Sequence, residues 1–214
     1  YNGENPSNTT GQNATEEPTV AGGNYDSATG LYTETTGAGY IWKYMYTIPT
    51  DDVLKFLSSD FMPIVLPANV SRTAVAGIAV AGAIDVALIE NAGSGLPASQ
   101  TLYTAIVGDG TGGKVKFVTN GAGTITSAEI EARGSGYTYG NVLLGNGNLF
   151  SNAGLSSAVT TGASAVGAIE VVLPPQGGHG SDQEVELNGK RVMTNIRLTY
   201  SEGSGDFPVD NDFR

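Results

Sequence analysis

The sequence predicts a mainly β protein, because glycine is abundant, charged residues are scarce and short alternating segments recur. The chain has 31 glycines among 214 residues, and only 14% of its residues are charged, well below the roughly 25% usual for soluble domains. Such a composition favours short strands joined by tight turns. We expect two lobes, the second inserted into the first, with one or two short helices.

The first 36 residues are predicted to run as an extended arm or loop. They are rich in Asn, Thr, Gly and Glu and contain few large apolar residues, so they bury little surface. The chain begins at Tyr1 with neither an initiator methionine nor a signal-peptide pattern. We therefore expect it to be an ordered portion of something longer.

The strongest strand pattern lies between residues 40 and 48 (YIWKYMYTI). Large side chains alternate there with period two, which is typical of a strand. One face of this strand is expected to form the structural core of the first lobe, with at least three members buried: Tyr40, Trp42, Tyr44, Tyr46 and Ile48. After Pro49, Thr50 is expected to cap a short helix that ends near Ser58.

Asn188 and Gly189 are predicted to form the turn of a β-hairpin between strands 184–187 and 190–193, since Asn-Gly suits a type I′ turn. In that register Glu186 faces Arg191. The second strand is expected to continue to residue 200 and to pair with the aromatic strand. The hairpin would then supply the remaining core residues: Val185, Val192, Ile196 and Leu198.

A change in amino-acid composition along the chain predicts the domain boundaries. Residues 67–167 are predicted to form an inserted Gly-rich β domain, and residues 37–66 and 168–214 a core β domain. Two similar segments, Ile84–Leu96 and Ile125–Tyr137, each contain a strand followed by Gly-Ser-Gly. Their offset, from position 84 to position 125, is 41 residues, which indicates a duplicated β unit. Lys114–Val118 alternates as a further strand between them.

The net charge limits the classes of partner. It is −11, from 21 acidic and 10 basic residues. An acidic surface repels phosphate backbones and anionic lipid, so we expect neither nucleic acid nor a membrane as a partner. The longest apolar stretch, Thr73–Ile89, falls short of the ~18–20 residues that span a bilayer. There is no cysteine, which excludes disulfides and thiolate metal sites.

Two motifs could carry chemistry, but structural roles are favoured for both. Gly108–Lys114 (GDGTGGK) has the spacing of a phosphate-binding loop, yet a strand follows where such a loop needs a helix. We therefore predict a hairpin loop. His179 is the only histidine, and one imidazole cannot build a multi-histidine metal site. We predict that it lies in a turn and is hydrogen-bonded to nearby backbone.

Carboxylates give no coherent active site either. Glu184 and Glu186 would share a strand face, but pairing of Glu186 with Arg191 is favoured over a glycosidase pair. The run Asp210–Asp212 lacks the glycine and distal glutamate of a calcium loop. We predict no catalytic, cofactor-binding or metal-binding residues and no cofactor, and hence a protein that is not an enzyme.

Several segments resemble the baseplate wedge proteins that gene 8 encodes in T4-like contractile-tailed phages. These segments are residues 40–48 (YIWKYMYTI), 55–56 (KF), 60–63 (DFMP), 174–180 (PPQGGHG) and 211–214 (NDFR). The resemblance implies a mainly β protein of two sandwich-like lobes without catalytic residues. It also implies a homodimer that contacts other baseplate wedge and tail proteins in the virion, after synthesis in the host cytoplasm.

Two other functions stay open at this point. The alternative is a glycan-binding tail fibre or spike domain, and a polysaccharide-degrading tailspike comes third. A shallow groove lined by exposed Trp or Tyr with carboxylates would favour these two functions. A buried Trp42 and large protein interfaces would favour the baseplate wedge.

Overall fold

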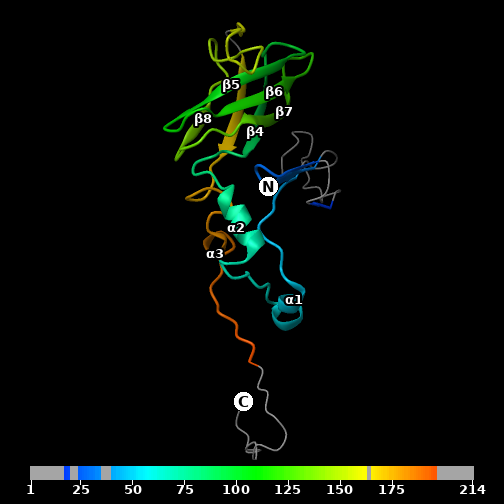
Figure 1. Cartoon of the computed structure of the whole chain (residues 1–214). Coiled ribbons are helices and arrows are strands. Elements are labelled where there is room, and N and C mark those ends of the chain that lie inside the picture. The colour runs from blue at the N-terminus through cyan, green and yellow to red at the C-terminus, as the bar shows by residue number, and fades with distance from the viewer. Residues whose placement is uncertain (1–16, 20–23, 35–39, 163–164, 197–214) are drawn as a thin grey trace, which may run out of the picture. The chain divides into compact units, whose positions relative to one another are not determined.

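The computed structural model describes residues 17–19, 24–34, 40–162 and 165–196. The fold is mainly β, with several antiparallel sheets and few short helices, and this confirms the predicted class (Figure 1). The chain divides into two compact units. The first unit consists of residues 1–47 and 64–189, and the second unit of residues 48–63 and 190–214.

The first unit contains a β lobe, which we define as residues 84–172. Its strands are β4 (Val86–Ser94), β5 (Thr101–Gly108), β6 (Lys114–Thr119), β7 (Ile125–Ala132), β8 (Gly140–Val142) and β9 (Val166–Val172). Strand β4 pairs with β9, and the other four form a sheet in the order β7-β6-β5-β8. All these pairs are antiparallel, and Figure 1 shows the strands gathered in one body.

The two sheets of the β lobe close around one apolar core. Strand β4 also contacts β7, and β8 contacts β9. Hydrogen bonds from Ile84 N to Arg133 O (3.0 Å) and from Leu96 N to Gly123 O (3.2 Å) join the sheets beyond both ends of β4. The alternation of β6 turns Val115 and Phe117 inward, where both are fully buried. Burial of each such side chain contributes about 1.5–3 kcal/mol to folding.

The two similar segments form β4 and β7, each followed by the same backbone at Gly-Ser-Gly. Positive φ angles between 61° and 77° occur at Gly93 and Gly95, at the end of β4, and at Gly134 and Gly136, after β7. A Cβ on Gly93 would lie 1.8 Å from Val166 O, so only glycine fits. The predicted hairpin loop 108–114 is also confirmed, since it joins the paired strands β5 and β6.

The edges of the β lobe differ from the predicted boundaries of the inserted domain. Strand β9 continues past residue 167 because it pairs with β4, up to the pair Val86 and Val172. The stretch after Pro67 forms helix α2 (Val70–Gly77) and not a strand. Asn69 caps this helix by accepting hydrogen bonds from the backbone N of Ser71, a signal that the sequence contains.

Part of the predicted N-terminal arm is a small sheet. Strands β1 (Tyr25–Asp26), β2 (Leu31–Thr33) and β3 (Ile41–Lys43) pair antiparallel in that order. The carboxylate of Asp26 fixes the turn between the first two strands by accepting hydrogen bonds from Ala28 N and Thr29 Oγ1. The prediction of an arm is therefore wrong for residues 25–33. Residues 1–16, 20–23 and 35–36 lie outside the described part.

The predicted strand 40–48 is only partly formed, and its core role is wrong. Strand β3 ends at Lys43 because its partner β2 is short and the following backbone bonds elsewhere: Tyr44 N donates to Gly30 O, and Met45 O accepts from Gln183. Trp42 is 37% exposed. The other four predicted core residues of this strand are only partly buried: Tyr40, Tyr44, Tyr46 and Ile48.

The predicted hairpin at Asn188 and Gly189 is replaced by the end of a helix. Helix α3 (Gln183–Glu186) ends with Asn188 at φ 58°. Asn188 N donates to Val185 O (3.1 Å) and Gly189 N to Glu184 O (2.7 Å), the bonding of a Schellman terminus. Asn-Gly suits both structures, because asparagine tolerates the left-handed backbone that each requires.

Loss of the hairpin also removes its predicted core. Val185, Val192 and Ile196 are exposed, since no partner strand covers them within the described part of the chain, and Leu198 lies outside that part. Glu186 pairs with His179 and not with Arg191. The second unit does contain the predicted helix, α1 (Thr50–Phe56). Pro49, not Thr50, stands at its cap position, without a side-chain hydrogen bond.

Candidate functional site

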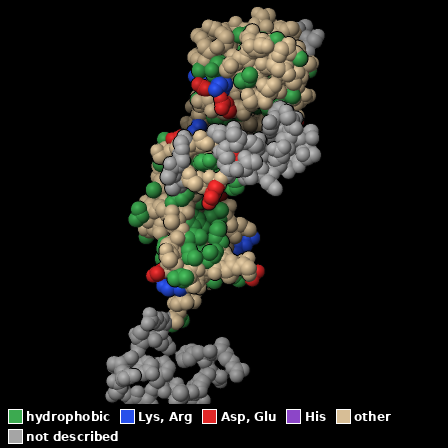
Figure 2. Space-filling model, turned by 90° about the vertical axis from the view of Figure 1, so that its right-hand side faces the viewer, with side chains coloured by type: hydrophobic (Ala, Val, Ile, Leu, Met, Phe, Trp, Pro, Cys, Tyr) green, Lys and Arg blue, Asp and Glu red, His purple; other side chains and the backbone are tan. Residues whose placement is uncertain are grey.

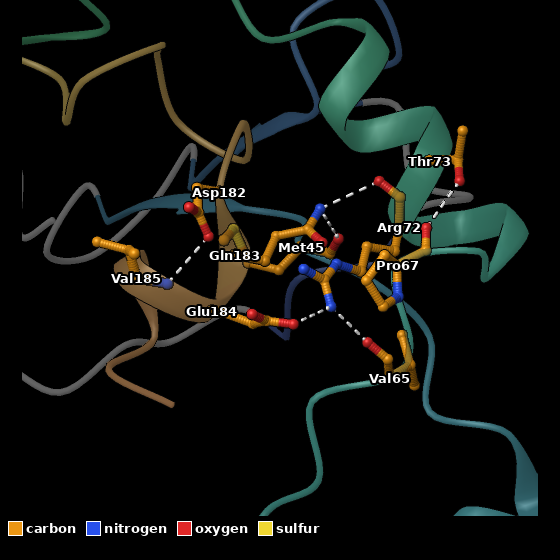
Figure 3. A network of polar contacts seen from close by, with 9 residues as sticks. All are labelled: Met45, Val65, Pro67, Arg72, Thr73, Asp182, Gln183, Glu184 and Val185. Carbon is orange, nitrogen blue, oxygen red and sulfur yellow. Dashed lines mark hydrogen bonds and ion pairs between the residues drawn. The ribbon is translucent and has the colours of Figure 1, made fainter. Parts of the chain in front are cut away.

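The first unit contains a polar junction, which we define as Met45, Val65, Arg72, Gln183 and Glu184 (Figure 3). Arg72 on α2 is almost fully buried, and its Nη1 donates to Val65 O (2.7 Å) and to Glu184 Oε1 (3.1 Å). A buried guanidinium requires such partners, because leaving water without them costs several kcal/mol. The pair therefore links α2 to α3.

Gln183 ties a third segment into the polar junction. It is only 1% exposed, and its Nε2 donates to Arg72 O (3.1 Å) and Met45 O (3.2 Å). Its Oε1 is buried without a hydrogen-bond partner among the described residues. A single amide thus joins α2, α3 and the segment after β3, which are far apart in the sequence.

Loop 174–180 lies against the same two helices. Its Gly178 is buried at φ 90°, and a Cβ there would lie 2.3 Å from Val80 O. His179 Nδ1 lies 2.5 Å from Glu186 Oε1, and Gly180 N donates to Glu186 Oε2 (2.7 Å). The histidine lies in a turn, as predicted, but the carboxylate partner from α3 was not foreseen. Glu186 holds the loop through both of its oxygens.

A group of charges lies next to this loop. Lys43 Nζ donates to Thr29 O, and the Lys43 side chain approaches Gly180. Desolvation by burial lowers the pKa of Lys43, and attraction to Asp85 partly opposes it. Asp85 is itself buried and is held by Arg133, whose Nη2 donates to Asp85 Oδ2 (2.9 Å). The Lys43 bond joins β3 to the turn before β2, and the pair of Arg133 with Asp85 joins the end of β7 to the start of β4.

The polar contacts of these groups hold separate segments of the chain together. The Glu184 carboxylate accepts from a cation, and the Glu186 carboxylate pairs with an imidazole and accepts from a backbone amide. Among the described residues neither carboxylate is paired with a nucleophile that it could activate. No group of three or more His, Asp or Glu that could hold a metal occurs within the described ranges. None of the described helices is long and apolar enough to cross a membrane.

The second unit presents a different kind of surface, which we call the apolar surface. Helix α1 buries none of its residues, and Leu54 on it is 80% exposed. Every residue of the segment 190–196 is exposed. The large exposed side chains of this surface are Leu54, Leu57, Phe61, Met62, Val192, Met193 and Ile196. Figure 2 shows many hydrophobic side chains, in green, at the surface outside the β lobe.

The small N-terminal sheet carries an aromatic pair of which Trp42 is exposed and Tyr40 half-buried. The ring centroids of Tyr40 and Trp42 lie 5.7 Å apart with the planes tilted by 33°. Tyr32 on β2 is the register partner of Trp42 and is buried. Part of the indole face therefore meets solvent, contrary to the expectation for a core residue.

No family model, curated protein or solved structure matches the chain. The site therefore has to be interpreted from its own residues. Sequence reasoning selected His179, Glu184 and Glu186 but missed Arg72 and Gln183, which organise the junction. The Asn69 cap before Arg72 was the available signal for α2, because an asparagine followed by Ser and Arg in a helical run indicates a helix start.

Proposed function

We propose that this chain is a non-enzymatic structural subunit of the baseplate wedge of a contractile phage tail. Its function there is to hold neighbouring wedge and tail proteins together through protein–protein contacts, as a homodimer in the virion. The apolar surface of the second unit carries this proposal. Soluble monomers rarely expose contiguous apolar patches larger than a few hundred Å², and larger ones mark interaction sites.

The polar junction supports the same function. A subunit that transmits load between neighbours needs its segments fixed relative to one another, and Arg72, Gln183 and Glu186 fasten α2, α3 and loop 174–180. Loop 174–180 is also one of the segments on which the resemblance to wedge proteins rests. The hydrogen bonds and the resemblance thus both draw attention to loop 174–180 as a part of the chain that supports the proposed function.

Cross-linking of intact tails from the phage that encodes this chain tests the proposal. Lys55 and Lys190 lie in the second unit and are exposed, so an amine-reactive reagent should join them to other tail proteins. Lys114 and Lys116 of the β lobe are the internal comparison. Absence of the chain from purified tails, or lysine cross-links confined to the chain itself, would contradict the proposal.

A glycan-binding tail fibre or spike domain is the second candidate, favoured by the exposed Trp42 and the half-buried Tyr40 beside it. Aromatic rings combine a large apolar face with polar edges, which suits the apolar face of a sugar ring. The chain has one tryptophan, so its fluorescence reports on this position alone. A saturable emission change with host surface polysaccharide, lost in Tyr40→Ala, would favour the glycan-binding function. The wedge proposal expects none.

A further inference from the structure

The segment 190–196 of the second unit is extended and pairs with no strand in the part of the chain that the structure describes (Figure 1). It is assigned no helix, strand or turn, and none of its backbone groups bonds to another described residue. The segment makes one ring contact among the described residues: the Arg191 guanidinium lies 5.4 Å from the centroid of the Phe61 ring. An exposed row of unpaired N–H and C=O groups is a template for pairing with another strand.

The side chains of this segment also follow a strand pattern. Val192, Thr194 and Ile196 alternate with Arg191, Met193 and Asn195, and β-branched residues favour strands. Val192 is 94% exposed and Ile196 is 81% exposed. A face of this kind remains unfavourable in water until another surface covers it.

The charge of the segment indicates the chemistry of its partner. Between Leu187 and Ser201 the sequence contains Lys190, Arg191 and Arg197 but no acidic residue, while all 21 acidic residues lie elsewhere. Opposite charges directly across from each other stabilise a strand pair, and like charges destabilise it. The segment therefore complements a strand that carries carboxylates.

The β lobe of a second copy does not offer such a strand. Its acidic strand β7, with Glu129 and Glu131, is flanked by β6 on one side and by β4 on the other. Strand β7 is the end strand of its sheet, but β4 lies beside it, and hydrogen bonds at Arg133 and Gly123 join the two segments just beyond the ends of these strands. Strand β4 therefore covers the outer edge of β7.

We infer that residues 190–196 add as a strand to an open, acidic sheet edge of another protein. This inference rests on the proposed function, because it names the chemistry of one neighbour. The backbone of 190–196 would supply the hydrogen bonds and the alternating side chains the specificity, as in other cases of β-strand addition. Val192 and Ile196 would cover apolar side chains of the partner, and Lys190 would meet its carboxylates.

The test measures amide hydrogen exchange of the full chain with a synthetic probe strand. The probe is a blocked heptapeptide of alternating Glu and Val, and the comparison peptide alternates Lys and Val. We expect the acidic peptide to slow exchange of alternate amides in 190–196 by at least about tenfold. Raising salt from about 50 mM to about 500 mM should weaken this protection several-fold.

A pair of variants at one position provides the control. Thr194→Pro removes a backbone donor and should weaken binding of the acidic peptide by about tenfold or more, while Thr194→Ala keeps the donor and should bind as wild type. Both should fold normally, because Thr194 is exposed and bonds to no other described residue.

Four results would overturn the inference. They are equal protection by the basic peptide, no protection by either peptide, protection by a DNA oligonucleotide, and protection that rises with protein concentration alone, which would identify a second copy. Failure here is separable from failure of the proposed function. Normal incorporation of the Thr194→Pro variant into tails would contradict only the inferred strand addition. Peptide binding by a chain that is absent from tails would contradict only the proposed baseplate function.

Discussion

The β lobe and the second unit use similar side chains in opposite ways. In the lobe, valine, isoleucine and phenylalanine point inward and are buried between two sheets. In the second unit, leucine, valine and isoleucine point into solvent from a helix and an extended segment. The lobe finds all of its strand partners within one stretch of chain. The described residues of the second unit form no strand pairs, and under the proposed function its partners are other proteins.

The largest effect is expected in the lobe core. Phe117→Ala should lower the free energy of unfolding by about 3–5 kcal/mol, because it removes a fully buried ring and leaves a cavity. Urea denaturation measures this loss. Val107→Ala on the neighbouring strand β5 is the control, since Val107 is half exposed and its loss should cost about 0.5 kcal/mol or less. Equal costs for the two variants would contradict the assigned core.

A smaller effect is expected at the polar junction. Arg72→Met keeps the length and packing of the side chain but leaves the buried Val65 carbonyl without its donor. The free energy of unfolding should fall by about 1–3 kcal/mol. Lys55→Met, which breaks only an exposed pair with Asp51, should change it by less than about 0.5 kcal/mol. A neutral Arg72→Met would show that the junction does not fasten α2 to α3.

A pH-dependent effect is expected at the loop between β5 and β6. Hydrogen bonds from the Thr138 side chain and backbone, and from Tyr139 N, lower the pKa of Asp109 to about 2. The group therefore adds stability above pH ~4, its unfolded pKa, and this contribution disappears as pH falls towards 2. Urea denaturation at pH 5 and pH 2.5 should show wild type and Asp109→Asn converging at the lower pH.

The smallest effect on stability is expected in the second unit. Val192→Thr removes little buried surface, so the isolated protein should unfold within about 0.5 kcal/mol of wild type. Incorporation into assembled tails should fall, because the variant weakens the apolar contact with a neighbour that the proposed function requires. Quantitative mass spectrometry of purified tails measures this. A clear loss of stability in the isolated variant would instead place Val192 in an internal core.

The sequence predicted the lobe better than the rest of the molecule. Alternation in Lys114–Val118 and glycine at the loop 108–114 are local signals, and both led to correct elements. Residues 40–48 misled because their alternation has no long partner strand, so packing could not enforce it. The prediction of a hairpin at Asn188 was wrong because an asparagine with left-handed backbone angles occurs both in hairpin turns and at helix C-termini. The junction pairs Arg72 with Glu184 and Gln183 across more than a hundred positions, which local patterns cannot reveal.

The pairing of Val86 with Val172 has a consequence for how such proteins change over time. The chain enters the β lobe through β4 and leaves it through β9, and these two strands are paired. The two ends of the lobe therefore lie close together, as the two ends of a turn do. Domains whose two ends lie close together can be inserted without disturbing the parent fold. Exchange of this lobe for another of the same span by recombination would therefore leave α2, loop 174–180 and α3 unchanged.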